Sequence, residues 1–402
     1  MGRLLKTILQ STKDVVFSGD FTLDLEGFDA METVLTLFAI VGAAIWLIIL
    51  VLPWRPWSTR EVLDGVSHLP QDDLSDITVL IPARNEEEMI QSTLPALLGQ
   101  AKGLHIILVD DQSTDGTFEV ARQLGGENLR IILGEVPPEG WSGKLWALEQ
   151  GRSHIETPLT LLLDADIEVK PGIIMELRRA MKERNVQLIS LMAELRMKTF
   201  WERMLLPAFI YFFKLLYPFR LSNSSSSKTA AAAGGCILVE TEVLKAIGAF
   251  ASLRGELIDD CALARKEKSS GFKTWMGLSH SVISLRPYNR LGIIWNMVAR
   301  SAFTQLGYSK LALFFCTIIM LTSFTMPGIG LWLSPVAVKL LSIFSLAGMA
   351  LTYLPTLRFY GISVWWALLM PLIGTLYLAM TWTSAIQHWL GETARWKGRT
   401  YQ

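Results

Sequence analysis

The sequence has few cysteines and no excess of charge of either sign. Its three cysteines, Cys236, Cys261 and Cys316, stand at spacings that match no zinc or redox motif. This usage fits a reducing compartment and excludes a disulfide-stabilised secreted domain. The 37 basic and 37 acidic side chains balance, so no basic excess indicates a nucleic-acid partner and no block of like charges indicates a disordered tail.

What the sequence has in excess is apolar residues. They make up 51% of the 402 residues, and the mean hydropathy of +0.35 is too high for an ordinary soluble protein. Residues 34–52 carry no charged side chain and are long enough to cross a bilayer as a helix. Residues 311–333, 338–354 and 362–386 are three further candidate spans, the middle one short. The sequence therefore predicts an integral membrane protein.

Charges next to the spans predict the orientation. The first candidate span begins well inside the chain, and its apolar run is too long for the core of a cleavable signal peptide. Arg55 and Arg60 follow it, whereas the preceding segment is rich in acids, so the positive-inside rule puts the central region in the cytoplasm. Three complete spans after that region would leave the C-terminus outside, yet Arg395, Lys397 and Arg399 favour the cytoplasm. We expect a cytoplasmic tail, with one apolar segment re-entrant, split or lying flat.

Three apolar strands, each followed by a polar turn, are expected in the central region. Residues 77–81, 105–109 and 161–163 are short aliphatic runs typical of buried strands. Helical patterns follow the first two turns, and repeated strand–turn–helix units predict an α/β fold with a doubly wound, mainly parallel sheet. In such sheets the carboxyl ends of the strands line the ligand crevice. We therefore expect the chemistry to lie in the three turns.

Two of these turns carry paired acids. Asp110 and Asp111 follow the second strand directly, and Asp164 and Asp166 follow the third at an i, i+2 spacing. Carboxylates at such a place can hold a hard divalent cation and, through it, a diphosphate. The structural alternative is that they sit in solvated turns or cap helices.

Capping explains part of the same pattern. Asn85 can cap a helix with Glu88 at the third position, as in a capping box. Ser113 or Asp115 can cap the next helix, which Gly125 would end.

Five motifs in order resemble those of a known family. They are residues 82–86 (Pro-Ala-Arg-Asn-Glu), 109–117, Gly143-Lys144, Asp164-x-Asp166, and residues 255–266 with Asp259-Asp260 near the centre. The set spans residues 77–287 and resembles the family 2 glycosyltransferases, which have the GT-A fold. More narrowly, residues 137–147, 233–238 and 396–399 resemble the hopene-associated membrane glycosyltransferases. The Gln-x-x-Arg-Trp element of the wider family is matched only at its end, by Arg395-Trp396.

The resemblance implies a role for each donor-side motif. Asp164 and Asp166 would bind Mg²⁺ or Mn²⁺, which bridges the diphosphate of a nucleotide-sugar, and Asp164 would also face the donor. Lys144 would bind a phosphate oxygen with its compact charge, unless it is a solvated surface lysine. The residues expected to bind the nucleotide are Pro82, Ala83, Arg84, Glu86, Asp110 and Asp111.

Asp260 is the expected general base. The reaction requires an acceptor hydroxyl to lose its proton as it attacks the anomeric carbon, and a carboxylate opposite the leaving group can accept that proton. The family pattern favours the second acid of the pair, while Asp259 and Glu256 stay open as alternatives. The pair could also simply open a helix, where the helix dipole favours acids.

Three further stretches carry expectations about the membrane and the donor. Residues 200–221 and 291–308 are predicted to be helices on the membrane surface. Residues 222–233 are of low complexity, are expected to bury little apolar area, and form either a lid over the donor or a plain loop. The tryptophans expected to anchor the first span at the interface are Trp46, Trp54 and Trp57.

The expected organisation has seven parts. They are an N-terminal segment (1–32), a transmembrane helix (33–53), a linker (54–76), the GT-A domain (77–287), an interfacial helix (288–310), a C-terminal transmembrane region (311–390) and a basic-aromatic tail (391–402). The spans and the resemblance together imply inverting, metal-dependent transfer from a nucleotide-sugar, expected to be a UDP-sugar, to a membrane lipid, first of all a hopanoid. The alternatives are a polyprenyl-phosphate, glycerolipid or ceramide acceptor, a processive polysaccharide synthase, and an inactive membrane scaffold.

The expected location is the inner membrane of a bacterium, with the GT-A domain in the cytoplasm. The partners are the donor, the lipid acceptor and the membrane. The sequence indicates neither the sugar nor the oligomeric state.

Overall fold

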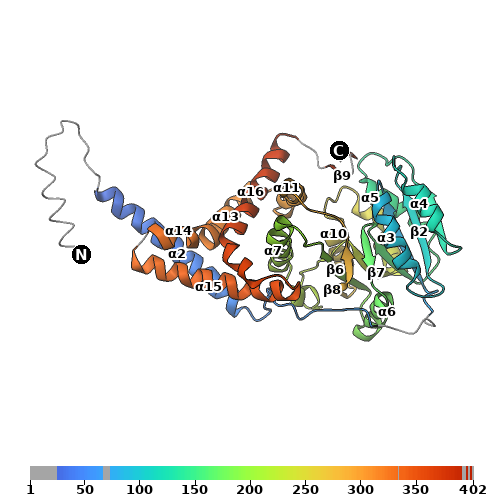
Figure 1. Cartoon of the computed structure of the whole chain (residues 1–402), viewed down its shortest axis with the longest axis horizontal. Helices are drawn as coiled ribbons and strands as arrows, with labels where there is room; N and C mark the ends of the chain where they lie inside the picture. The colour runs from blue at the N-terminus through green and yellow to red at the C-terminus, as the bar shows by residue number, and fades with distance from the viewer. Residues whose placement is uncertain (1–24, 67–72, 334, 392–394, 397–398, 401–402) are drawn as a thin grey trace, which may run out of the picture.

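An α/β domain and a bundle of apolar helices make up the molecule (Figure 1). The computed structural model describes residues 25–66, 73–333, 335–391, 395–396 and 399–400. Of the expected N-terminal segment, residues 1–24 lie outside the described residues, and the rest already belongs to helix α2 (Leu25–Val51). Helices α7 (Phe200–Leu216) and α11 (Leu291–Ala299) lie between the bundle and the α/β domain.

The centre of the α/β domain is a sheet that has eight strands within the described residues. Its order is β3-β2-β1-β4-β7-β6-β8-β5. Four of the seven neighbouring pairs are parallel and three are antiparallel, so the expected doubly wound sheet is present with a mixed second half. The strands are β1 (Ile77–Ala83), β2 (His105–Asp110), β3 (Leu129–Leu133), β4 (Leu159–Leu163), β5 (Ile167–Val169), β6 (Leu188–Leu195), β7 (Cys236–Glu240) and β8 (Thr274–Ser284).

Alternate side chains of the central strands pack on opposite faces of the sheet. Val79 and Ile81 of β1 belong to a core cluster that includes residues of α3 and α6, whereas Leu80 packs on the other face with residues of α5 and α10. All seven residues of β1 are buried, as expected for a parallel strand that is covered by helices on both sides.

The helices fall into two groups. Those of the α/β domain are α3 (Glu87–Leu98), α4 (Thr117–Leu124), α5 (Gly143–Arg152), α6 (Ile173–Arg184), α8 (Phe219–Ser222), α9 (Thr241–Ala246), the short 3₁₀ helix Phe250–Leu253 and α10 (Asp259–Ser269). Beyond α11 come α12 (Ala302–Gln305), α13 (Lys310–Met320), the π-helical turn Leu321–Thr325, α14 (Met326–Leu333), α15 (Val336–Phe359), the 3₁₀ helix Val364–Leu369 and α16 (Met370–Trp389). In the tail, β9 (Arg395–Trp396) pairs with β10 (Arg399–Thr400).

The predicted capping box at the start of α3 is wrong. The helix begins at Glu87, and its N-cap residue, Glu86, makes no side-chain capping bond. Asn85 instead has a φ of 51°, a left-handed conformation that asparagine tolerates, and its Oδ1 accepts the N–H of Thr114 at 2.8 Å. Its side chain therefore joins the first two turns rather than capping a helix. Gly125 ends α4, as predicted.

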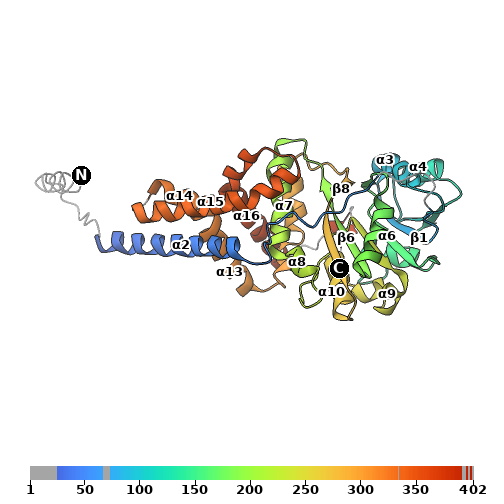
Figure 2. The same cartoon turned by 90° about the horizontal axis from the view of Figure 1, so that it is seen from below.

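Within the described residues, four segments are long and apolar enough to cross a membrane. They are Met31–Val51, Lys310–Trp332, Val336–Phe359 and Val364–Trp389, and they match the four predicted candidates. The third is longer than predicted because Pro355 lies inside α15 instead of ending it. Apolar helices tolerate such a proline when neighbouring groups satisfy the backbone groups that it frees. Figure 2 shows α2, α14 and α15 running together away from the α/β domain.

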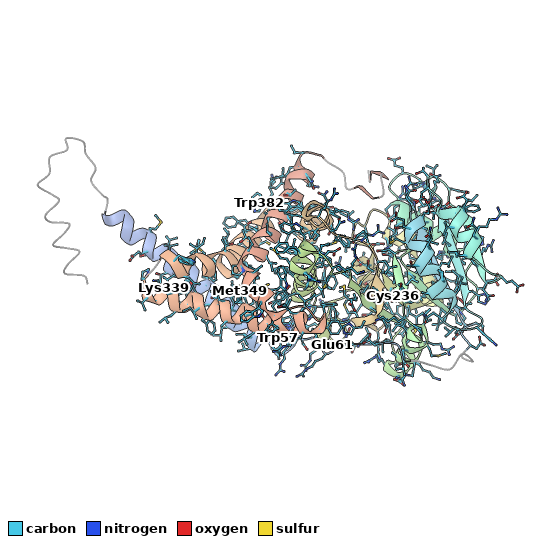
Figure 3. The ribbon with its side chains drawn as sticks, in the orientation of Figure 1. Trp57, Glu61, Cys236, Lys339, Met349 and Trp382 are labelled. Carbon is cyan, nitrogen blue, oxygen red and sulfur yellow. The ribbon has the colours of Figure 1, made fainter. Side chains whose placement is uncertain are left out.

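Trp46 packs the bundle together. Its side chain is fully buried, its Nε1 donates to the carbonyl of Ser323 at 2.8 Å, and its ring meets Phe324 edge-on at 5.3 Å. A Cβ on Gly348 would lie 3.0 Å from Trp46 Cβ, so a small residue allows this close approach. The prediction that Trp46 anchors the membrane interface is therefore wrong, whereas Trp57 does lie at the junction with the α/β domain (Figure 3).

Helix α7 is a buried connector and not the predicted membrane-surface helix. Thr199 and Glu202 close its N-terminus as a capping box, and Glu202 also accepts the N–H of Tyr288 at 2.9 Å. Further along, Lys214 is 1% exposed, and its Nζ lies 3.4 Å from Thr356 Oγ1 of α15. Helix α7 thus connects the α/β domain to the bundle. The second predicted surface helix is broken into α11 and α12.

Both ends of the fourth apolar segment, Val364–Trp389, which includes α16, contact helices next to the α/β domain. Trp366, just before the helix, meets the ring of Phe200 in α7 at 5.3 Å. Trp389, its last residue, meets the ring of Phe303 in α12 at 5.7 Å. In Figure 1, α16 runs obliquely to α2 and α15 rather than alongside them.

Candidate active site

The predicted acidic turns meet at one edge of the sheet. Strands β2, β1 and β4 are neighbours and run parallel, with Ala83 opposite Asp110. Their carboxyl ends therefore deliver Asp110, Asp164 and the residues after Ala83 to the same edge, as the sequence predicted. The backbone N–H of Asp111 donates to the carbonyl of Ala83 at 2.7 Å, which fixes the first two turns together.

The side chains of the first two turns hold this edge in shape. Arg84 Nη1 donates to the carbonyls of Asp111 and Gln112. Asp110 Oδ1 accepts the N–H of Ser113 at 3.0 Å, so its side chain helps to shape the turn, in line with the structural alternative. Asp110 and Asp111 are buried. The contacts thus explain the shape of the turn, and a nucleotide role for these residues remains a prediction.

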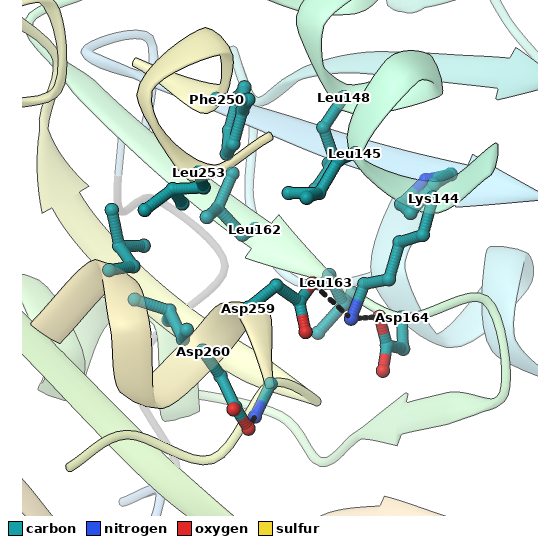
Figure 4. Close-up of a pocket in the computed structure, with 14 residues that line it drawn as sticks. Lys144, Leu145, Leu148, Leu162, Leu163, Asp164, Phe250, Leu253, Asp259 and Asp260 are labelled. Carbon is teal, nitrogen blue, oxygen red and sulfur yellow. Dashed lines mark hydrogen bonds and ion pairs between the residues drawn. The ribbon is translucent and has the colours of Figure 1, made fainter. Parts of the chain in front are cut away.

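Lys144 lies between two acids from different parts of the chain. Ser142 caps α5 by accepting the N–H of Leu145 at 3.2 Å, which places Lys144 in the first turn of the helix. Its Nζ lies 2.9 Å from Asp164 Oδ1 and 3.6 Å from Asp259 Oδ2 (Figure 4). Although burial opposes the charged form, these two carboxylates raise the pKa of Lys144. Lys144 is therefore a cation that the surrounding acids hold charged and in place.

A pocket opens beside this cation. Its polar lining comes from Asp164, which follows β4, and from α5 and α10, and Leu145 and Leu163 give it an apolar wall (Figure 4). The residues predicted from sequence that line it are Pro82, Lys144, Asp164, Asp259 and Asp260.

The two adjacent acids of α10 have different surroundings. Asp259 faces Lys144, whereas Asp260 has no ion pair among the described residues. Asp260 instead accepts the N–H of Gly234 through Oδ2 at 2.8 Å and the N–H of Cys261 through Oδ1 at 2.7 Å. Burial, and then the charge of Asp259, raise the pKa of Asp260 to about 6. A carboxylate of this kind is a better proton acceptor than an ordinary aspartate.

The segment before Gly234 is anchored, contrary to the expectation that it buries little apolar area. Residues 230–233 are four buried alanines. The N–H of Ala233 donates to Ser190 Oγ at 2.7 Å, and Lys268 Nζ donates to the carbonyls of Ser222 and Thr229 at 2.6 Å. These bonds hold Gly234 against Asp260.

Asp166 has a partner that the sequence reasoning missed. Its Oδ2 accepts a hydrogen bond from Ser284 Oγ at 2.8 Å and lies 3.2 Å from Arg286 Nε. Arg286 also reaches Glu86, with 2.6 Å between Nη2 and Oε1. Neither Ser284 nor Arg286 belongs to a motif, and only the pairing of β5 with β8 brings them to Asp166.

Divalent metal binding fits these residues only together with a substrate. Within the described residues, no group of three or more His, Cys, Asp or Glu side chains gathers as a metal site. Asp164 and Asp166 are separately paired with Lys144 and Arg286. Two carboxylates suit a Mg²⁺ or Mn²⁺ ion whose remaining ligands are waters and substrate phosphates. The donor set is therefore adequate for a metal held jointly with a diphosphate.

The α/β domain has the fold of a glycosyltransferase. The chain belongs to the family described as glycosyltransferase like family 2, whose model matches residues 75–304. A mannosyltransferase, PcManGT from Pyrobaculum calidifontis, determined with GDP-Man and Mn²⁺, has the same fold. It superposes with a TM-score of 0.55 at 17% identity and covers 89% of this chain and 99% of that chain.

Two curated relatives align over a shorter stretch. A 4,4'-diaponeurosporenoate glycosyltransferase of Staphylococcus haemolyticus is 34% identical over 113 residues, which are 28% of this chain and 30% of that protein. The protein of the same name from Staphylococcus aureus (strain USA300) is 35% identical over 91 residues, or 23% of this chain and 24% of that protein. The chain thus aligns with less than a third of the length of these relatives.

Proposed function

We propose that this glycosyltransferase moves one sugar, with inversion, from a nucleotide-sugar to a membrane lipid. The observation that carries the proposal is the pocket that Lys144, Asp164 and Asp260 line together. A cation suits the leaving diphosphate, and a carboxylate with a raised pKa suits the incoming hydroxyl. Direct attack opposite the leaving group inverts the anomeric carbon.

On the donor side, Lys144 neutralises a phosphate oxygen. Asp164 and Asp166 would hold a Mg²⁺ or Mn²⁺ ion, which supplies electrostatic stabilisation of the leaving nucleoside diphosphate. The nucleotide lies along the ends of β1 and β2. The residues that we assign to it are Pro82, Ala83, Arg84, Glu86, Asp110 and Asp111.

On the acceptor side, Asp260 accepts the proton of the attacking hydroxyl. Its contacts with Gly234 and Cys261 fix the orientation of the carboxylate, and the absence of an ion pair among the described residues leaves its charge available. Asp259 is engaged by Lys144 and acts as a positioning residue. Glu256 is exposed and is the weaker candidate for the base.

The lipid acceptor is supported by the apolar helices that adjoin the site. Tyr217, which follows α7, donates to Gln305 Oε1 of α12 at 2.6 Å. Tyr217 also packs in the same apolar cluster as Cys261, the neighbour of Asp260. Elements on the membrane side therefore pack against the apolar cluster that contains Cys261, which is next to the proposed base in the sequence.

The acceptor class that we propose is a polycyclic or polyisoprenoid lipid. The curated relatives are named for a carotenoid acid, 4,4'-diaponeurosporenoate, and the narrower sequence resemblance favours a hopanoid. Polyprenyl phosphates, glycerolipids and ceramides are the alternatives within the same reaction.

We propose that the α/β domain faces the cytoplasm at the bacterial inner membrane. Arg55 and Arg60 support this through the positive-inside rule. The segment Val364–Trp389 supports a cytoplasmic tail, because its two ends both contact helices next to the α/β domain. An oblique or re-entrant α16 leaves two crossings after the domain and returns the basic tail to the cytoplasm.

The experiment is incubation of membranes that contain the protein with a panel of labelled nucleotide-sugars. Extracted lipids are then analysed by mass spectrometry. We expect one lipid class to gain a single sugar, dependent on Asp260. A ladder of products with many sugars would favour a processive synthase. No transfer and no metal-dependent donor hydrolysis with any donor would favour an inactive scaffold.

A further inference from the structure

Arg286 is the one cation in direct contact with Asp166 among the described residues. The strand pairing fixes this contact. Ser284 lies opposite Ile167 in the β5–β8 ladder, and the N–H of Leu285 donates to the carbonyl of Asp166 at 2.9 Å. Because the backbone is locked on both sides, the side chains of Asp166 and Arg286 are held face to face.

Arg286 has a second acid in reach. Its Nη2 lies 2.6 Å from Glu86 Oε1, shorter than the 3.2 Å between Nε and Asp166 Oδ2. Glu86 is 7% exposed, and its N–H donates to Thr117 Oγ1 at 2.9 Å, so its position is fixed. A guanidinium can bind two carboxylates through different N–H groups. It can therefore lose one partner and keep the other.

Space for such a movement exists on the Glu86 side. A pocket there is lined by Arg286, Pro287 and the first residues of α3, with the acids Glu86, Glu87, Glu88 and Asp115. The negative charge around this pocket attracts the guanidinium. Arg286 can therefore move towards Glu86 when a second cation approaches Asp166.

We propose that Arg286 is a resident counter-ion of Asp166, which it releases to the divalent metal while Glu86 retains the guanidinium. This inference rests on the proposed metal use. Arg286 thereby sets how tightly the donor-free enzyme binds metal: it neutralises Asp166 in the resting state and must be displaced when the ion enters. It is a positioning residue.

The test measures Mn²⁺ binding to the full-length protein in detergent, without donor, from the loss of the electron paramagnetic resonance signal of free Mn²⁺. Arg286→Gln removes the competing charge, so we expect Mn²⁺ to bind about tenfold more tightly, the scale of a close charge pair. Glu86→Gln removes the alternative partner, so Arg286 stays on Asp166 and Mn²⁺ should bind several-fold more weakly. The double variant should match Arg286→Gln, because Glu86 then has no guanidinium to retain.

The matched control is Arg152→Gln. Arg152 is 28% exposed and pairs with Glu149, much as Arg286 is 31% exposed and pairs with Glu86. It lies in the last turn of α5, and its removal should leave Mn²⁺ binding unchanged. Thermal unfolding of each variant shows that it is folded, and the opposite sign expected for Glu86→Gln tests the idea even if Arg286→Gln does not fold.

Two results would overturn this inference without affecting the proposed metal use. Unchanged or weaker Mn²⁺ binding in Arg286→Gln would mean that Arg286 organises the site rather than competing for it. A double variant as weak as Glu86→Gln would mean that Glu86 itself holds the ion. If the wild-type protein binds no Mn²⁺ either alone or with UDP, the proposed metal use fails, and this inference with it.

Discussion

Replacing Asp260 with asparagine should separate the chemistry of the site from its stability. Asparagine keeps the shape of the side chain, and its oxygen can still accept one of the N–H bonds that now come from Gly234 and Cys261. It cannot take a proton. We expect the rate at saturating donor to fall by about 10²–10⁴-fold, the usual contribution of a general base. Donor affinity should change little, because Lys144 and Asp164 remain in place.

The same substitution should stabilise the fold at neutral pH. Burial and Asp259 raise the pKa of Asp260 from 3.8 to about 6, so the folded protein holds this proton more tightly than the unfolded chain does. The cost of ionisation is absent below about pH 4, grows as the pH rises, and is complete above about pH 6. Asp260→Asn removes this cost, although the variant also loses a charge-assisted hydrogen bond. The melting temperature of Asp260→Asn should therefore exceed that of the wild type at about pH 8 and lose this advantage near about pH 4.

The rate of the wild-type enzyme should depend on pH through the ionisation of the same carboxyl group. Asp260 accepts a proton only when ionised, so transfer should fall as the pH drops through about 6 and reach about a tenth of its plateau one unit lower. The assay is the initial rate of label transfer from nucleotide-sugar to extracted lipid, with Asp76→Asn, a change in an aspartate outside the pocket, as control. Wild-type turnover by Asp260→Asn would refute the reasoning. Loss of donor binding with the saturated rate intact would move the base to Asp259 or Glu256.

Four other changes test the remaining parts. Asp166→Asn should lower transfer by about 10²-fold or more, because the metal supplies several kcal/mol of transition-state stabilisation; added Mn²⁺ should restore chelator-treated wild type but not this variant. Lys144→Gln should weaken UDP binding, measured by calorimetry, since it removes the cation between Asp164 and Asp259; unchanged affinity would contradict a phosphate role. Glu242→Cys, at an 82% exposed side chain, should react with a membrane-impermeant thiol reagent only after cells are opened, and labelling of intact cells would reverse the proposed orientation. Thr199→Ala removes the N-cap of α7 and should cost about 1 kcal/mol of stability, seen as a lower melting temperature with no change in donor affinity.

The strand ends and their acids could be predicted because both signals are local. Aliphatic runs followed by acids mark the ends of β2 and β4, and parallel neighbours bring those ends together. The cluster of Lys144, Asp164 and Asp259 follows once the strands and α10 are in place. The predicted fold alone brings these side chains to the same edge of the sheet.

Contacts set by the later strands could not be predicted in this way. Arg286 reaches Asp166 through an antiparallel β5–β8 pairing, and 120 residues separate the two in sequence. No periodicity in a single sequence encodes that register. Trp46 shows the same limit in the bundle: a tryptophan near the end of an apolar run is typical of an interface anchor, and only the packing of α2 against the π-helical turn Leu321–Thr325 and α15 buries it.

The two acids of α10 show what structure adds to a motif. In the sequence, only the family pattern favours Asp260 over Asp259 as the base. In the fold, one faces a lysine and the other receives two backbone N–H bonds in a half-buried position. Different surroundings can therefore suit neighbouring carboxylates to different tasks, which we propose are placing the cation and accepting the proton.

This division of tasks also bears on the acceptor. A lipid hydroxyl must lose a proton as it attacks, so its glycosylation depends on Asp260 and on pH as described above. A lipid carboxylate, the group that ends the acid named in the curated relatives, is already ionised and needs no base. With such an acceptor, Asp260→Asn would lower the rate far less, and the fall below about pH 6 would follow the acceptor's own ionisation rather than that of Asp260. The pH profile of the Asp260→Asn variant thus distinguishes the two acceptor chemistries: a loss on the order of 10²-fold or more on the plateau above about pH 6, with no acid-side fall left in the variant, indicates a hydroxyl. A near-normal rate with the acid-side fall retained indicates a carboxylate.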